Sequence, residues 1–240
     1  MKTKMNKELR LAQLKALEVF GKKAKTFALC GGTALELYYL KHRFSADLDF
    51  FSPRFNNKEI AEIVTAFDKA FGKKFKLESE FILPDRAKVK FYTIKVKGSQ
   101  RPLKIDFAED VLFKNPEISR IRGVRVYSAK NIYLMKIMAM AGNRIQTDDI
   151  GRQTMHGRQA ARDVFDVYVL SKKIMPLHLY LKEIPGNLQR GMIHWYRTFS
   201  RQETKLSLLD LDIYDKKFNA HEMIMYLENE IKEFMKEVVG

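Results

Sequence analysis

The segment that decides the fold is Cys30-Gly31-Gly32-Thr33, followed after thirteen residues by Asp47-Leu48-Asp49-Phe50-Phe51. Side chains alternate along a strand, so Asp47 and Asp49 are expected on one face while the apolar residues between them enter the core. Two glycines between a strand and a helix leave backbone N–H groups open to a phosphate. The segment therefore predicts a strand, a glycine turn, a helix and a second strand that presents two carboxylates.

The residues around this segment predict a mixed sheet with flanking helices. Apolar spacing indicates a helix over residues 9–20 that stops at Gly21, and Asn56 with Glu59 has the pattern of a helix cap that opens a helix over residues 56–72. Thr33 and Glu36 have the T-x-x-E spacing of a capping box. Short apolar or alternating runs predict strands at residues 26–30, 46–51, 75–82, 87–96 and 103–107.

The second half of the chain is helical. Helices are expected over residues 128–143 and 158–173 and in further stretches as far as residue 240. The last of them has an apolar stripe formed by Ile224, Leu227, Ile231, Phe234 and Val238. Residues 145–157 are polar and flanked by glycines, which predicts a mobile loop. We expect an α+β fold with a sheet domain over residues 1–127 and a helical domain over residues 128–240.

The charge favours a phosphate-rich partner. The 240 residues hold 44 Lys and Arg against 29 Asp and Glu, a net charge of +15. Residues 1–25 carry eight basic side chains against two acidic ones, and residues 120–162 carry nine against two. Basic zones of this kind are typical of proteins that bind RNA or nucleotides, although many basic surfaces are only solvated.

Cysteine usage and hydropathy point to the reducing cytoplasm. Cys30 is the single cysteine, so the chain has no internal disulfide, and no Cys/His spacing suits zinc. The basic N-terminus lacks the apolar region of a signal peptide. The most apolar stretch, residues 27–40, is shorter than the roughly 20 residues of a membrane span. We therefore expect a cytoplasmic protein without a membrane partner.

A third acidic residue joins the first two. Asp106 lies in the KIDF run at residues 104–107, where Ile105 and Phe107 are expected to face the core. Three carboxylates from two strands are what two Mg²⁺ ions require, one to activate a hydroxyl and one to stabilise a leaving phosphate oxygen. The plain alternative, a polar strand face exposed to solvent, stays open for each acid taken alone.

The helix expected from residue 158 carries a narrow polar stripe. Arg158, Arg162 and Asp166 superpose at four-residue spacing, with Asp163 beside them, while apolar residues occupy the rest of the helix. This stripe could belong to a site. It could equally be a surface salt bridge between Arg162 and Asp166, which contributes about 0.3–0.5 kcal/mol.

These motifs together resemble a known family. GGTAL at residues 31–35, RFSADLDF at 43–50, KIDF at 104–107, Lys136 and RDVFD at 162–166 resemble the nucleotidyltransferase AbiEii/AbiGii toxin family of the DNA polymerase β-like superfamily. The resemblance covers roughly residues 26–170. It implies a nucleotidyltransferase fold and catalytic domain over residues 1–127. Residues 145–157 are added length by comparison with the family.

The resemblance also implies roles for individual residues. Asp47, Asp49 and Asp106 would bind two Mg²⁺ or Mn²⁺ ions, and Asp106 could help to deprotonate the acceptor. Lys136 would contact nucleotide phosphates. Arg43 would either orient the strand acids or be a partly buried structural arginine. The expected catalytic residues are Asp47, Asp49, Asp106, Lys136 and Asp163. The expected nucleotide-binding residues are Gly31, Gly32, Thr33, Arg43, Lys136, Arg162 and Asp166.

The activity that follows is metal-dependent transfer of a nucleoside monophosphate from an NTP to an acceptor hydroxyl, with release of pyrophosphate. The resemblance implies tRNA or another RNA as the acceptor, and the basic charge of the chain suits such an acceptor. The family resemblance implies a toxin of a toxin–antitoxin or abortive-infection system with an antitoxin partner. Two alternatives stay open: a small-molecule acceptor such as an aminoglycoside, and a non-catalytic module that binds nucleotide or RNA.

Overall fold

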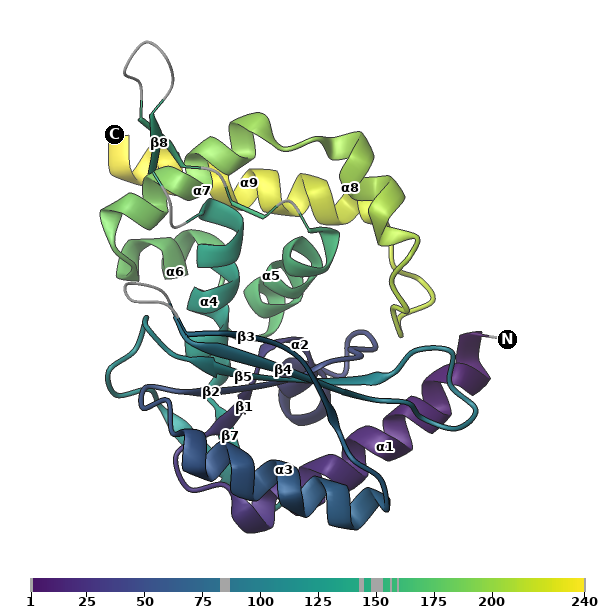
Figure 1. Cartoon of the computed structure of the whole chain (residues 1–240). Coiled ribbons are helices and arrows are strands. Elements are labelled where there is room, and N and C mark those ends of the chain that lie inside the picture. Colours follow the sequence, from purple (N-terminus) through teal and green to yellow (C-terminus); the bar gives the residue numbers. More distant parts are fainter. Residues whose placement is uncertain are drawn as a thin grey trace. The chain divides into compact units, whose positions relative to one another are not determined.

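The chain forms two compact units in a computed structural model that describes residues 2–82, 87–142, 145–147, 153–155, 157–158 and 160–239 (Figure 1). The first unit consists of Met1–Tyr39 and Phe44–Ser128, and the second of Leu40–Arg43 and Ala129–Gly240. The domain boundary expected after residue 127 stays a prediction. The segment Leu40–Arg43 groups with the second unit although it lies early in the chain.

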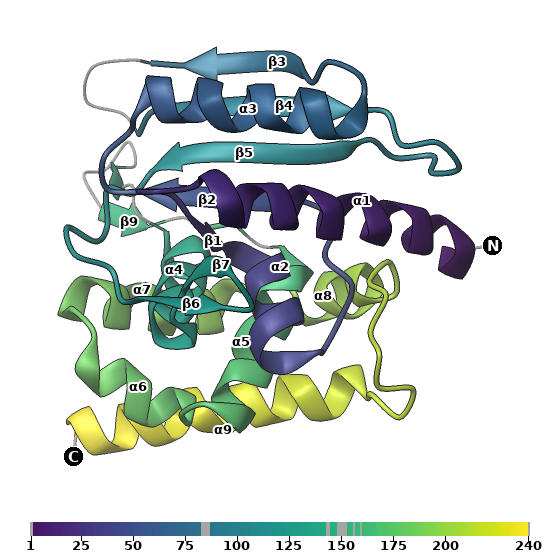
Figure 2. The same ribbon diagram turned by 90° about the horizontal axis from the view of Figure 1, so that it is seen from below.

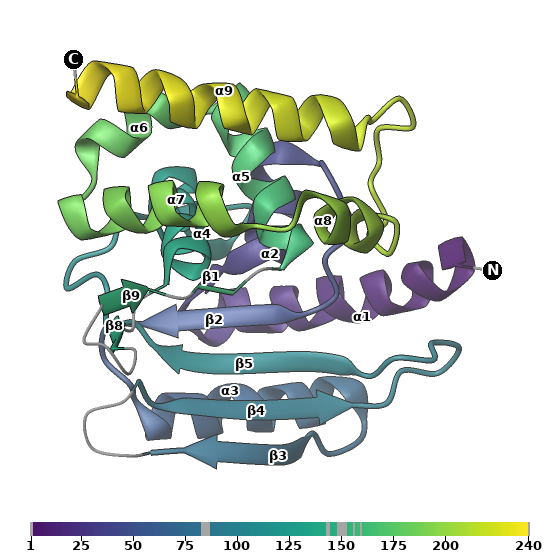
Figure 3. The ribbon, with the colours of Figure 1, turned by 90° about the horizontal axis from the view of Figure 1, so that it is seen from above.

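A mixed sheet forms the first unit. Within the described residues its seven strands have the order β3-β4-β5-β2-β1-β7-β6 (Figures 2 and 3). The pairs β1·β7 and β2·β5 are parallel and the other neighbours are antiparallel. The strands are β1 (Ala28–Cys30), β2 (Leu48–Ser52), β3 (Lys76–Phe81), β4 (Val89–Ile94), β5 (Leu103–Glu109), β6 (Ile118–Ile121) and β7 (Val124–Tyr127). The hairpin of β6 and β7 was not among the predicted strands.

Two helices cover one face of this sheet. α1 (Lys2–Lys23) and α3 (Asn57–Phe71) lie side by side on it, as Figures 1 and 2 show. Phe20 of α1 stacks on Phe50 of β2 with ring centroids 3.8 Å apart, and Phe107 of β5 packs beside Phe50. All three rings are fully buried. The core therefore lies between these helices and the central strands.

Gly21 does not end the first helix, as the sequence predicted, because α1 continues to Lys23. The glycine serves packing instead. A Cβ atom at Gly21 would lie 2.7 Å from the carbonyl oxygen of Gly123 in the turn between β6 and β7. Arg120 joins the two places, since its Nη1 donates to the carbonyl oxygens of both Gly21 and Gly123. Only glycine allows this close approach.

The two predicted helix caps had different outcomes. Asn56 is confirmed as the N-cap of α3, because its Oδ1 accepts from the backbone N–H groups of Lys58 and Glu59. The helix ends at Gly72, whose φ of +67° is the left-handed conformation typical of a glycine after a helix. The Glu59 carboxylate turns elsewhere and accepts from the backbone N–H groups of Lys25 and Thr26.

The predicted capping box of Thr33 and Glu36 is wrong. α2 (Gly31–Ala34) starts at the glycines without a side-chain cap, and it continues as a π-helical segment, η1 (Leu35–Leu40). Thr33 Oγ1 donates to the carbonyl oxygen of Asp47 at 2.5 Å, and Glu36 accepts from the backbone N–H of Ser45. Both side chains therefore fasten the segment before β2, which is a long-range role that local spacing does not reveal.

Helices form most of the second unit (Figures 1 and 3). They are α4 (Ala129–Ala141), α5 (Ala161–Lys173), α6 (Leu177–Glu183), α7 (Gly186–Thr198), α8 (Arg201–Leu208) and α9 (Ala220–Val239). The apolar stripe predicted for α9 is confirmed from Ile224 to Phe234, which are buried, but Val238 is 56% exposed. α5 begins at Ala161, three residues later than predicted.

The mobile loop predicted over residues 145–157 is wrong where strands occupy it. β8 (Ile145–Thr147) and β9 (Gln153–Met155) pair as an antiparallel hairpin, and residues 148–152 lie outside the described residues. Gly157 follows, where a Cβ atom would overlap the carbonyl oxygen of Met140 at the end of α4. The chain therefore returns tightly against α4 after the hairpin.

Candidate active site

Two carboxylates stand opposite each other on neighbouring strands of the first unit. Asp49 of β2 is the register partner of Asp106 of β5 in the parallel pair β2·β5, which Figure 3 shows side by side. The alternation predicted for these strands is confirmed: Leu48, Phe50, Ile105 and Phe107 are fully buried, and both aspartates are half-buried on the other face. Asp47 lies immediately before β2 and is also half-buried.

Negative charge is crowded at this pair. Burial and the nearby charges of Asp49 and Asp47 together raise the pKa of Asp106 to about 7, against a smaller lowering by Lys104. The three carboxylates are therefore close enough to repel one another, as we expected for acids that a cation would hold together. We name Asp47, Asp49 and Asp106 the carboxylate site.

The glycine turn makes room for one of these acids. Gly31 has φ +70°, and a Cβ atom on it would overlap Oδ2 of Asp49. Gly32 and Thr33 follow in α2 and are both buried. The hydrogen bond from Thr33 to the backbone of Asp47 fixes the chain at the entry to β2. The predicted phosphate-binding residues thus lie directly against the carboxylate site.

The carboxylate site suits a hard divalent cation in its chemistry. Carboxylate oxygens are the ligands that Mg²⁺ and Mn²⁺ prefer, and a cation would relieve the repulsion that raises the pKa of Asp106. Within the part of the chain that the structure describes, however, no group of three or more His, Cys, Asp or Glu side chains is arranged to hold a metal ion. The two expected ions stay a prediction.

A second cluster of charged residues lies within the second unit. Asp166 of α5 accepts from Nε and Nη2 of Arg43 at 2.7 Å each, and its carboxylate is 2.8 Å from Nζ of Lys136. Lys136 also donates to Asp163 at 2.6 Å, and Arg158 donates to Asp163 at 2.8 Å. We name these five residues the ion-pair cluster. Apart from Arg158 they are buried.

The charges in this cluster hold one another in the ionised state. Burial opposes the charge of Lys136, but Asp166 and Asp163 outweigh it and raise the pKa of Lys136. Burial likewise opposes ionisation of Asp166, but Lys136 and Arg43 hold the pKa of Asp166 well below its usual range. Three basic side chains against two carboxylates leave the cluster with a positive charge, which favours an anionic ligand.

Some predicted site residues lie elsewhere than expected. Of the two roles expected for Arg43, the contacts fit the buried structural one, because Arg43 binds Asp166 through two parallel hydrogen bonds. The alternative pairing of Arg162 with Asp166 is wrong, because Asp166 is fully buried and Arg162 is exposed. Arg162 is therefore outside the ion-pair cluster.

Sequence reasoning missed His42. Its Nε2 lies 2.8 Å from Oδ1 of Asp166, and its ring stacks on Phe165. No periodic pattern marks this histidine, and its position beside Arg43 in the chain was the only available signal. Arg158 was predicted to lie near Asp163 and Asp166 on one face of a helix. It does contact Asp163, but it lies before the first residue of α5, so helical spacing is not the cause of this contact.

The fold and the carboxylate site define a nucleotidyltransferase, and sequence comparison agrees. Residues 14–238 match the family described as "Nucleotidyl transferase AbiEii toxin, Type IV TA system". The chain belongs to this family of nucleotidyltransferase toxins, as the resemblance of its motifs predicted. Because the family is one of toxin–antitoxin systems, membership suggests a cognate antitoxin as partner.

Two solved structures from Helicobacter pylori have a similar fold. JHP933 is 19% identical, with 98% of this chain and 93% of that chain covered and a TM-score of 0.59. A second protein, described as a candidate nucleotidyltransferase, is 20% identical, with 100% and 97% covered and a TM-score of 0.60. At these identities the similarity concerns the fold alone, and it confirms the predicted α+β nucleotidyltransferase fold. No match was found among curated proteins.

None of the helices in the described part of the chain combines the length and the apolar character that a membrane span needs.

Proposed function

We propose that this protein transfers a nucleoside monophosphate from an NTP to a hydroxyl group of RNA, with tRNA as the expected acceptor, and that it acts in this way as a toxin. The observation that carries the proposal is the register pairing of Asp49 with Asp106 beside the glycine turn. Two half-buried carboxylates beside a glycine turn at the start of a helix are the parts that nucleotidyl transfer requires.

The chemistry assigns each group a task. The acceptor oxygen attacks the α-phosphorus, the bond to the bridging oxygen of the leaving pyrophosphate breaks, and the proton of the hydroxyl passes to Asp106. Asp47, Asp49 and Asp106 would hold Mg²⁺ or Mn²⁺, which when bound neutralises charge on the attacking and leaving oxygens. Gly31 has no side chain and therefore lets the carboxylate of Asp49 lie directly against the backbone of the glycine turn. Positioning and electrostatics then supply the catalysis, without a covalent nucleophile.

Charge supports RNA as the acceptor. The net charge of +15 attracts a polyanion and would repel a cationic aminoglycoside. For the second unit we keep the role that the family resemblance implies, in which Lys136 contacts nucleotide phosphates.

The test is transfer of label to total RNA. The protein is incubated with tRNA-containing RNA, Mg²⁺ or Mn²⁺, and each of the four NTPs labelled at the α-phosphate. We expect label on RNA from at least one NTP, and none when the same NTP carries the label at the γ-phosphate. Transfer of the γ-label would indicate a kinase, and labelling of a small molecule instead of RNA would overturn the proposed acceptor.

Replacing Gly31 with alanine is expected to abolish most of this transfer. The new Cβ atom would displace the carboxylate of Asp49, and the positive φ would add roughly 1–2 kcal/mol of backbone strain. Gly72→Ala is the matched control, because Gly72 has φ +67° but no atom within 4 Å of the added Cβ. Both variants should lose similar stability in chemical denaturation. If Gly31→Ala transferred label as fast as Gly72→Ala, Gly31 would not shape the site.

A further inference from the structure

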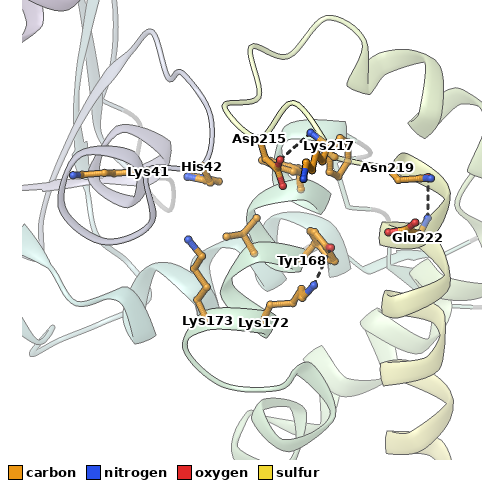
Figure 4. A pocket seen from close by; sticks show the side chains of 12 residues that line it. Lys41, His42, Tyr168, Lys172, Lys173, Asp215, Lys217, Asn219 and Glu222 are labelled. Atoms are coloured by element: carbon orange, nitrogen blue, oxygen red, sulfur yellow. Dashed lines mark hydrogen bonds between the residues drawn. The ribbon is translucent and has the colours of Figure 1, made fainter.

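The second unit contains a pocket that the proposed function does not use. It has a volume of about 400 Å³ and is formed by the segment Leu40–Arg43, α5, residues 215–219 and the first turn of α9 (Figure 4). Four lysines line it: Lys41, Lys172, Lys173 and Lys217. We name it the lysine pocket.

The lysines of this pocket are available for an anion. None of the four ammonium groups forms an ion pair with a carboxylate of the described residues. Lys172 reaches the hydroxyl of Tyr168 at 3.4 Å, and Lys173 donates to the carbonyl oxygen of Leu40 at 3.1 Å. Figure 4 shows Lys172 and Lys173 starting from the same helix and ending apart, Lys172 at Tyr168 and Lys173 on the side of His42. We therefore consider Lys172, Lys173 and Lys217 as the lysines that could contact an anion in this pocket.

The same pocket offers an aromatic surface and hydrogen-bond acceptors. The ring of Tyr168 is half-buried and lies 5.4 Å from the ammonium group of Lys172. The carboxylates of Asp215 and Glu222 also line the pocket. A ligand that fits must therefore combine negative charge with a flat ring and with N–H or O–H donors.

His42 adds a buried polar group to this lining. Its Nδ1 is buried and has no hydrogen-bond partner among the described residues. Its Nε2 lies 2.8 Å from Oδ1 of Asp166, so the ring is held in place by the ion-pair cluster.

We propose that the lysine pocket binds one nucleotide unit, with the phosphate against Lys172, Lys173 and Lys217 and the base on the apolar side formed by Tyr168. Lysines beside an aromatic ring are the usual combination for binding an unpaired nucleotide, and the volume is within the range of small-ligand sites. An acidic peptide fits less well, because its side-chain carboxylates offer no donor to Asp215 and Glu222, whereas the amino and hydroxyl groups of a nucleoside do. We assign this nucleotide to the RNA acceptor, and this assignment rests on the proposed function.

The test is RNA binding without NTP, so that no transfer occurs. A fluorescein-labelled single-stranded RNA of twelve nucleotides is titrated with the wild-type chain and with Lys172→Glu/Lys217→Glu. The matched control is Lys205→Glu/Lys232→Glu, which changes two exposed, unpaired lysines on helices of the same unit by the same charge. Thermal unfolding checks that all three proteins are folded.

We expect the pocket variant to weaken RNA binding by roughly tenfold or more and to reduce the slope of log K against log salt by about 0.7, because the contact to one phosphate is lost. The control should change affinity less than about threefold. Equal weakening by both variants would overturn the proposal, since net charge alone would explain it. Displacement of the RNA by a glutamate-rich peptide, in the wild type but not in the pocket variant, would assign the pocket to a protein partner instead.

Competition with AMP distinguishes the two sources of a nucleotide. Displacement of RNA by AMP in the wild type but not in the pocket variant would support a site that also takes a free nucleotide. Lysine-dependent RNA binding without competition would support a site for a nucleotide within a strand. RNA binding is measured separately from label transfer. RNA binding that depends on these lysines would support the pocket even if no transfer to RNA is found. Transfer to RNA without lysine-dependent binding would overturn the pocket proposal and leave the proposed function intact.

Discussion

Replacing Asp166 with asparagine is expected to lower the free energy of unfolding by about 3–5 kcal/mol, the usual cost of breaking a buried ion pair. The Asp166 side chain is fully buried and is bound by Arg43, Lys136 and His42. Removing its charge leaves the buried Arg43 without the carboxylate that binds it through two hydrogen bonds, and leaves Lys136 with one carboxylate of the two. Chemical denaturation of the wild type and the variant measures the difference.

The stability that Asp166 contributes should depend on pH in one direction. Although burial opposes ionisation, Lys136 and Arg43 hold the pKa of this carboxyl well below the roughly 3.9 expected for the unfolded chain. A group whose pKa is lower in the folded state stabilises the fold above its unfolded pKa and loses this effect as the pH falls toward its folded pKa. The advantage of wild type over Asp166→Asn should therefore be constant near neutral pH and shrink below about pH 4.

Asp210 provides the control, because it is exposed and lies in the same unit. Asp210→Asn should leave the free energy of unfolding within about 0.5 kcal/mol of the wild type, as is usual at surface positions. Equal stabilities of Asp166→Asn and Asp210→Asn would contradict the interpretation of the ion-pair cluster as a structural feature of the second unit.

Replacing Asp49 with asparagine is expected to reduce label transfer by at least about 10²–10³-fold, the effect of removing one charged group aligned with a transition state. Stability should not fall, because Asp49 is half-buried and its charge repels that of Asp106. Without the charge of Asp49, the pKa of Asp106 should move down from about 7. Transfer assays and denaturation of the same preparations give both readouts.

The combination of lost transfer and retained stability is the informative result for Asp49. A loss of stability of several kcal/mol would mark Asp49 as a structural residue of β2. Full transfer by a folded Asp49→Asn protein would remove the residue from the active site.

The carboxylate site could be predicted because strand alternation is a local rule. Once β2 and β5 were recognised, the burial of Leu48 and Phe50 on one face required Asp49 on the other. That Asp49 and Asp106 are register partners depends on strand pairing, which the motif resemblance implied but no local spacing contains. Family membership thus supplied the long-range part of the site.

The wrong predictions were those that depended on which distant residue a side chain or glycine contacts. Glycine at position 21 indicates a helix end, but here it admits the backbone of Gly123, a residue far away in the chain. Thr33 and Glu36 have capping spacing, yet their side chains bind the segment before β2. Helical periodicity also placed Arg162 near Asp166. It could not show that the Asp166 side chain faces the interior of the unit, where Arg43 binds it.

The most direct test of the central claim, that the acids on β2 and β5 carry out nucleotidyl transfer, is the initial rate of α-label transfer by Asp106→Asn beside Glu109→Gln. Both residues lie on β5, but on opposite faces of the strand, and Glu109 pairs with Lys88. We predict that Asp106→Asn is folded and transfers no label, whereas Glu109→Gln transfers it at a rate close to that of the wild type. Transfer by Asp106→Asn at the rate of Glu109→Gln would contradict the assignment of this site.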